Sequence, residues 1–203
     1  MKARLAAFVA VVALGACSAP TVPDFTWYRL PRPQPPPALT QPWAGSVVVE
    51  DFVADGLYAD QALVYALDAD AQQLRQYHYQ MWADPPTRML QRRLAVTLRG
   101  AGLARTVSDE LPASRDAMRI RGNLLRMDRV PTSAGGWEVV VVLKLRAVAP
   151  GDRVLVDDIY RDGEPAGGSE LKASVDAYGA AIDRIYARFL ADLQQHHGDG
   201  DAR

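Results

Sequence analysis

A single cysteine, Cys17, sets the main constraint on how this chain of 203 residues can fold. One thiol cannot form a disulfide within its own chain, so apolar side chains have to hold the folded state together. The composition allows this, because 49% of the residues are hydrophobic. About 160 residues follow the most proline-rich part of the chain, which is a normal size for one domain. We therefore predict one globular domain that is stabilised by its core alone.

The residues before Cys17 have the three parts of a secretory signal peptide. Two basic residues come first, residues 5–14 form an uninterrupted apolar run, and two small residues follow. The apolar run has about ten residues, whereas a membrane-spanning helix needs roughly 20. We interpret residues 1–16 as a signal peptide that is removed from the mature protein.

The sequence Leu14-Gly15-Ala16-Cys17 resembles a bacterial lipobox. The resemblance implies cleavage between Ala16 and Cys17, a diacylglyceryl group on the Cys17 sulfur, and a further acyl chain such as palmitate on the new amino terminus. Three acyl chains would hold the protein stably on a bilayer. By the sorting rule for such lipoproteins, Ser18 directs the protein to the periplasmic face of the outer membrane; the inner membrane is the alternative if the rule does not apply. An ordinary signal peptide that contains a cysteine is the other interpretation.

Residues 17–45 form a predicted tether that starts at the lipidated cysteine. Eight of the fourteen prolines lie between Pro20 and Pro42, and such a composition favours an extended chain that cannot pack into a core. The exception is the aromatic segment 25–30, with the sequence Phe-Thr-Trp-Tyr-Arg-Leu. We predict a short strand there that returns to the domain, and the alternative is an exposed hydrophobic patch near the membrane.

Residues 46–195 carry the hydrophobic patterns of an α+β domain. The patterns predict strands at 46–53, 62–67, 74–82, 105–107, 118–130, 137–148 and 154–160. Short turns between consecutive strands favour antiparallel pairing, and we expect the first three strands to form a meander. The prediction is a single domain with a mainly antiparallel sheet and two main amphipathic helices packed on it.

The two helices have recognisable beginnings. Asp84-Pro85-Pro86 is typical of a helix start with Asp84 as the N-cap, and leucines then recur every four residues from 90 to 98. Ser169 is the predicted cap of the second helix, whose apolar residues recur at helical spacing over 171–193. Residues 196–203 are a predicted disordered tail, in which two adjacent histidines do not make a metal site.

The sequence contains no recognisable catalytic motif. It has no G-x-S-x-G, no H-E-x-x-H and no phosphate-binding loop, and His78 is the only histidine within the predicted domain. Asp157 and Asp158 are adjacent on a predicted strand and should face opposite sides. We predict no enzymatic activity, no metal and no cofactor besides the covalent lipid. The 23 basic and 24 acidic residues form no concentrated basic patch, which argues against a nucleic-acid partner.

Five residues are candidates for contact with a lipid or a protein partner. Tyr77, Tyr79 and Trp82 lie on a predicted strand, and Arg88 and Arg92 share a face of the first predicted helix. The alternative for the aromatic residues is ordinary packing in the sheet. For the arginines, the alternative is a solvated helix face.

The order of these features resembles the ABC-type transport auxiliary lipoproteins of the paraquat-inducible protein C type. The matching features are the lipobox at Cys17, Tyr28-Arg29-Leu30, Trp82-Ala83-Asp84-Pro85-Pro86 before a helix, and an alanine-rich terminal helix around 177–181. The proline insert at 31–37 departs from the family's pattern.

The resemblance implies a function without catalysis. The protein would be the outer-membrane accessory component of a transport system built from an ABC ATPase, a permease and an MCE-domain protein, which moves lipids between the inner and outer membranes. It would receive the MCE assembly, and it could form homo-oligomers. The alternative is a structural envelope lipoprotein that assists the assembly of another outer-membrane machine.

Overall fold

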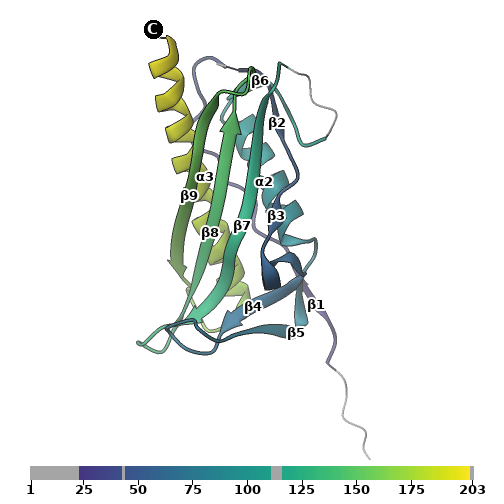
Figure 1. Ribbon diagram of the computed structural model, residues 1–203. Helices are drawn as coiled ribbons and strands as arrows, with labels where there is room; N and C mark the ends of the chain where they lie inside the picture. The colour runs from purple at the N-terminus through teal and green to yellow at the C-terminus, as the bar shows by residue number, and fades with distance from the viewer. Residues whose placement is uncertain (1–22, 43, 111–115, 202–203) are drawn as a thin grey trace, which may run out of the picture.

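The computed structural model of the protein describes residues 23–42, 44–110 and 116–201. One curled sheet of nine strands forms a layer, and two helices pack against one of its faces (Figure 1). This single α+β domain confirms the predicted fold class. The sheet is mixed, because its long strand pairs are antiparallel and several short pairs are parallel. The predicted cleavage and lipidation site at Ala16 and Cys17 lies outside the described residues.

The predicted strands are present with shifted bounds. The segment 46–53 is divided between two strands, and the strand predicted at 154–160 is longer. The strands are β1 (Thr26–Tyr28), β2 (Ala44–Val49), β3 (Val53–Ala54), β4 (Ala62–Ala66), β5 (Leu74–Trp82), β6 (Ala104–Ser108), β7 (Met118–Pro131), β8 (Trp137–Val148) and β9 (Val154–Pro165). The helices are the short 3-10 helix η1 (Gly56–Ala59), α2 (Pro86–Gly100) and α3 (Leu171–Asp201).

The long strands β7, β8 and β9 form the antiparallel part of the sheet. In β8, Leu143 and Leu145 are fully buried, whereas Lys144 and Arg146 are exposed. Alternate residues of a strand face opposite sides of the sheet. One face is therefore apolar and packs against the helices. The opposite face, which we call the charged face, carries exposed charged residues such as Lys144 and Arg146, together with a second, small apolar cluster of Ala66, Val130 and Val140.

The predicted meander of the first three strands is wrong. β4 and β5 do pair antiparallel, but β2 lies between β6 and β7 and is parallel to both. β4 is also parallel to β7. A hydrophobic run such as Val47–Val49 identifies a buried strand, but it contains no information about which strands lie beside it. Here the sequence between β2 and β6, including α2, forms the long connection that parallel neighbours require.

The core lies between the apolar face of the sheet and the two helices. Trp82 of β5 packs edge-on against Tyr178 of α3, with 5.6 Å between the ring centroids. Both helices contribute side chains that are 0% exposed, namely Leu90, Leu94 and Leu98 of α2 and Ile182, Ile185, Tyr186 and Phe189 of α3. These residues follow the spacing from which the two amphipathic helices were predicted.

The start of α2 differs from the prediction by one residue. Pro85 occupies the N-cap position with φ −52° and ψ 136°, and it makes no side-chain capping hydrogen bond. A residue before proline is restricted to extended conformations, so the helix can begin only at Pro86. The prediction of Asp84 as the N-cap is therefore wrong, and its carboxylate lies instead 3.8 Å from Arg92.

Helix α3 is longer than predicted. It begins at Leu171, so Ser169 lies one residue before the N-cap position, and it continues to Asp201. Residues 196–201, predicted as a disordered tail, are therefore helical. The apolar pattern stops near Leu193, which is fully buried. Such a pattern shows how far a helix packs against the core, and the backbone helix can continue beyond that point.

Gly122 of β7 provides a test of how closely this core is packed. A Cβ atom at this position would overlap the ring of Phe52, which is buried in the core. We expect Gly122→Ala to lower the free energy of unfolding by about 1–3 kcal/mol, because the enclosed ring cannot move aside freely. Urea unfolding followed by circular dichroism measures this change.

Gly163→Ala in β9 is the matched control. Its Cβ would lie 3.4 Å from the carbonyl oxygen of Val139, which is an ordinary contact. We expect a change within about 0.5 kcal/mol for this variant, and equal losses in the two variants would contradict the packing argument.

Candidate functional site

The proline-rich segment is fixed on the helices. We call residues 31–39 the proline strap. The backbone N–H of Gln34 donates to the Asp183 carboxylate at 3.0 Å, and that of Leu39 donates to the Ala101 carbonyl at 2.9 Å. The side chain of Leu39 packs against the core. The expectation that this segment cannot pack is therefore wrong, because its residues contact both helices.

Arg93 of α2 joins the strap to α3. Its side chain is 4% exposed and lies 2.8 Å from the Asp183 carboxylate. The guanidinium also donates to the carbonyl oxygens of Pro31 and Gly179. A Cβ atom at Gly179 would overlap the Pro31 ring, so glycine at this position allows the strap to approach the helix. One buried cation thus links two helices and the segment that precedes the domain.

An exposed aromatic cluster lies where the chain enters the domain. β1 pairs in parallel with β5, as the prediction of a short returning strand requires. Phe25 is 56% exposed and Trp27 is 54% exposed. The Phe25 ring lies 6.3 Å from that of Trp27 and 5.5 Å from that of Tyr79. We call these three residues the aromatic patch, which combines the two interpretations that the sequence left open.

The other two aromatic candidates have different surroundings. Trp82 is 2% exposed and belongs to the core, so its predicted role as a surface contact is wrong. Tyr77 is half-buried, and its hydroxyl accepts a hydrogen bond from Arg129 at 3.0 Å. Its ring lies 4.5 Å from that of Tyr65. Tyr79 is therefore the one of the three predicted aromatic residues that belongs to the aromatic patch.

Arg88 and Arg92 line a groove of about 580 Å³ at the start of α2. Three acidic residues, Asp51, Asp109 and Glu110, line the same groove, so its charge is mixed. The Arg92 side chain and its partner Asp84 are both 49% exposed. The arrangement fits a solvated helix face, and a role for the two arginines in partner contact stays a prediction.

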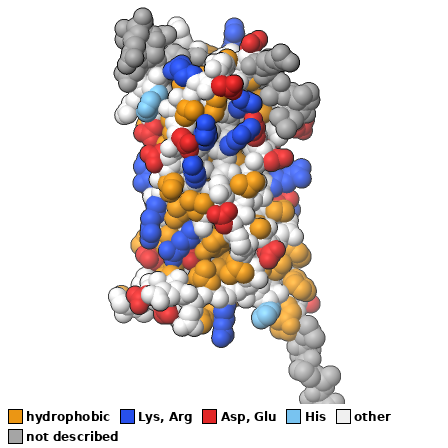
Figure 2. Space-filling view, in the orientation of Figure 1, with side chains coloured by type: hydrophobic (Ala, Val, Ile, Leu, Met, Phe, Trp, Pro, Cys, Tyr) orange, Lys and Arg blue, Asp and Glu red, His pale blue; other side chains and the backbone are white. Residues whose placement is uncertain are grey.

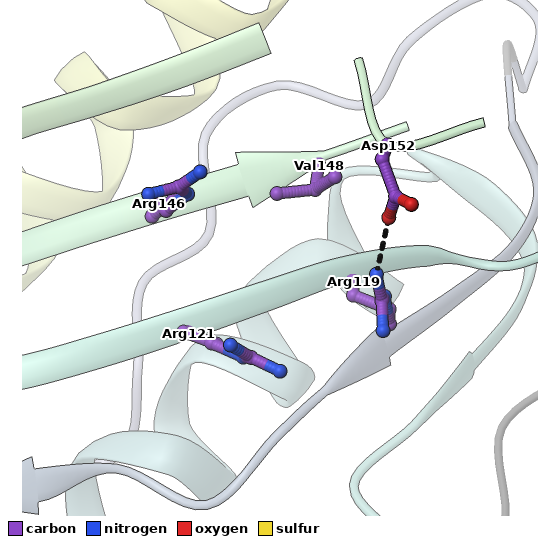
Figure 3. A pocket seen from close by; sticks show the side chains of 5 residues that line it. All are labelled: Arg119, Arg121, Arg146, Val148 and Asp152. Carbon is purple, nitrogen blue, oxygen red and sulfur yellow. Dashed lines mark hydrogen bonds and ion pairs between the residues drawn. The ribbon is translucent and has the colours of Figure 1, made fainter. Parts of the chain in front are cut away.

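A cationic pocket of about 320 Å³ lies on the charged face of the sheet (Figure 3). Its lining combines the start of β7, the end of β8 and the turn that follows β8, through residues Arg119, Arg121, Arg146, Val148 and Asp152. Three arginines and one aspartate give this lining a formal charge of +2. Each guanidinium has a carboxylate partner, which holds the three side chains over the sheet.

No pattern in the sequence predicted the cationic pocket as a site. Arg119 and Arg121 alternate with apolar residues, which is the signal that places them on one face. Arg146 comes from a different strand and meets Arg121 only through the register of β7 with β8. Figure 2 views this face and shows basic and acidic side chains gathered over the upper part of the long strands.

A buried polar group supports β7 below the pocket. Asp128 is 1% exposed and accepts hydrogen bonds from Arg126 at 2.7 Å and from the Tyr58 hydroxyl at 3.5 Å. Burial, followed by the negative charge of Asp128, raises the pKa of Tyr58 to about 12. A tyrosine held neutral in this way keeps its proton for the hydrogen bond. The group is therefore a structural link between η1 and the sheet.

The described residues bring no catalytic set together. Asp157 pairs with Lys144 and Arg146 on the charged face, whereas Asp158 is paired in register with Leu145, whose side chain points to the core. Within the described part of the chain, no group of three or more His, Cys, Asp or Glu residues could hold a metal ion. Among the same residues, no helix is long and apolar enough to cross a membrane.

Residues 28–189 match the family model described as the ABC-type transport auxiliary lipoprotein component. No match was found among curated proteins. Among solved structures, protein XCC0632 from Xanthomonas campestris, of the family DUF330, is similar with a TM-score of 0.73 and 16% identity over 87% of this chain and 98% of its own. An uncharacterized protein gives a TM-score of 0.65 with 14% identity over 84% and 99% of the two chains. At these identities the structures establish likeness of fold alone.

Arg93 can be tested against its neighbour on the same helix. We expect Arg93→Met to lower the free energy of unfolding by about 3–5 kcal/mol, because Asp183 loses its buried partner. Hydrogen exchange of the strap amides should rise at the same time, which mass spectrometry measures.

Arg92→Met is the control for the buried position. Its ion pair is exposed, and such pairs contribute about 0–1 kcal/mol. If both variants left strap exchange unchanged, the strap would not depend on Arg93.

Proposed function

The chain belongs to the ABC-type transport auxiliary lipoprotein family, and from this membership we propose that it is the outer-membrane component of an MCE-type lipid transport system. In this proposal the protein is anchored by a lipid on Cys17 at the periplasmic face. It binds an MCE-domain protein, and through that protein it is connected to an ABC permease and an ATPase. Its contribution is to hold these partners in place for lipid exchange.

The anchor rests on the amino-terminal sequence. A short apolar run, a lipobox-like tetrapeptide and Ser18 agree with export, lipidation and sorting to the outer membrane. The link between Cys17 and the domain is short, because β1 begins at Thr26 and is already paired with β5. The strap of residues 31–39 follows β1 and is held on the helices by Arg93 and backbone hydrogen bonds, so it adds no free length.

The cationic pocket is the observation that carries the proposal for a partner site. β1, where the chain enters from Cys17, lies at one end of the molecule, and the start of β7 and the end of β8 lie at the other end (Figure 1). A partner that arrives from the inner membrane would meet this second end. The three arginine side chains of the pocket are about half exposed, so they can donate to acidic side chains on that partner in addition to their own carboxylates.

Charge reversal in the pocket tests the proposed partner site. We expect Arg119→Glu with Arg146→Glu to reduce co-purification of the MCE-domain protein by at least about tenfold, because like charges across an interface cost several kcal/mol. Quantitative mass spectrometry of the affinity-purified, detergent-solubilised complex gives this ratio. The mass of the purified complex also reports whether the protein forms a homo-oligomer.

Arg75→Glu is the matched control, because Arg75 is an exposed arginine of β5 outside the pocket. Its co-purification should equal that of the natural chain. Recovery of a β-barrel protein instead of an MCE-domain protein would support the alternative role in assembling another outer-membrane machine. Equal loss in both variants would remove the pocket from the proposal.

The anchor has its own test. Cys17→Ser should abolish incorporation of labelled palmitate and leave an uncleaved precursor, because the modified sulfur is missing. Cells with this variant should show the same outer-membrane permeability defect as a deletion. Unchanged labelling would place the lipid elsewhere and contradict the anchor.

A further inference from the structure

The exposed rings of the aromatic patch face away from the core because side chains alternate along an extended chain. Phe25, just before β1, and Trp27, on β1, lie on either side of Thr26 in the extended chain, so their side chains face one side. The opposite side carries Tyr28, which packs against the core together with its register partner Trp82. Phe25 and Trp27 are therefore exposed because of their register, and no rotation of a single side chain would bury them.

The patch is held rigidly at the end of the sheet. β1 is paired with β5 over all three of its residues. Beyond the pair, the Ala83 N–H donates to the Tyr28 carbonyl at 2.8 Å, and the Trp82 N–H donates to the Gln61 carbonyl at 2.7 Å. An exposed aromatic cluster on a fixed strand is typical of a contact surface, because it loses little conformational entropy when it binds.

The length of chain before the patch limits what can cover it. Eight residue steps separate Cys17 from Phe25, and eight fully extended residues span at most about 29 Å. The pairing of β1 with β5 fixes the domain end of this link on the sheet, so no later part of the chain can lengthen it. If Cys17 carries lipid, the patch always lies within this distance of the bilayer.

We propose that Phe25, Trp27 and Tyr79 insert into the headgroup region of the bilayer that holds Cys17. Tryptophan and tyrosine are enriched at this depth, where their apolar rings and their polar N–H and O–H groups are both satisfied, and the Phe25 ring adds apolar area. Asp24 and Arg29 flank the patch with opposite charges and are exposed. Apolar contact, and not attraction to anionic lipids, is therefore the main force that would hold the patch in the bilayer.

We call this insertion of the aromatic patch the footing. It rests on the lipid anchor of the proposed function, and it adds an orientation of the domain relative to the bilayer. One flexible link would let the domain tumble, whereas a link together with a rigid patch fixes the end that faces the bilayer. The cationic pocket then points away from the membrane. β7 has 14 residues, which as a strand span about 45 Å, so the pocket would lie about that far from the bilayer surface.

Tryptophan quenching by brominated lipids tests the footing directly. The lipidated mature protein is reconstituted in vesicles of dibrominated phosphatidylcholine and compared with the same vesicles without bromine. Bromine quenches only at short range, so we expect at least about a twofold larger quenched fraction in the natural chain than in Trp27→Phe. The difference should persist at high salt, because screening acts on charges and leaves apolar contact unchanged.

Trp137→Phe is the matched control. Trp137 begins β8, and the Arg129 guanidinium lies 3.9 Å from the centroid of its ring in a cation–π contact within the sheet. Its replacement should therefore leave the quenched intensity unchanged, and the quenched fraction should not fall. Equal quenching in Trp27→Phe and the natural chain would overturn the footing. Crosslinking of Trp27 to a second copy or to another protein, without quenching by lipid, would overturn it too.

The outcomes separate the footing from the proposed function. Labelled palmitate in every variant confirms the anchor independently of the quenching. Quenching of Trp27 without any MCE-domain partner would leave the footing standing and remove the transport role. Co-purification of that partner without quenching of Trp27 would support the transport role and overturn the footing.

Discussion

The buried guanidinium of Arg93 is the interaction on which the arrangement of this protein depends. It contacts α3 through Asp183 and Gly179 and the proline strap through Pro31. A buried ion pair is weak evidence for net stability, because both charges lose hydration. Its geometric effect is clearer, since several hydrogen bonds to one planar group fix three segments relative to one another. The strap consequently becomes part of the domain, and the link to Cys17 is limited to the residues before β1, which is paired with β5.

In the proposed function, the short link to Cys17 would give the two ends of the sheet different tasks. The end with β1 and β5 stays close to Cys17, and the end with the cationic pocket lies along the length of the long strands from it. Both tasks are binding tasks, which agrees with membership in a family of transport auxiliary components. The apolar face of the sheet is covered by the helices, so the charged face and the two ends are the surfaces available for partners.

The sequence predicted the α+β class, the approximate positions of the strands and both helices, because each follows from a local period of apolar residues. It also identified the aromatic segment at 25–30, but it could not decide between a strand and an exposed patch. The structure contains both, since Tyr28 faces the core and Trp27 faces outward. The same alternation separates Tyr79, which is half-buried and contacts Phe25, from Trp82 in the core. Amino-acid composition does not distinguish the buried aromatic residues of this region from the exposed ones.

The sequence by itself determined that the chain has one cysteine and that it forms two amphipathic helices with enough strands to pack against them, and it predicts an export signal. Only the tertiary structure decided which strands are neighbours, that the proline-rich segment lies on the helices, and that Arg119, Arg121 and Arg146 share one pocket. The physical reason is the same in each case. Local patterns report which residues avoid water, whereas pairing register and buried polar contacts join residues that are distant in the chain.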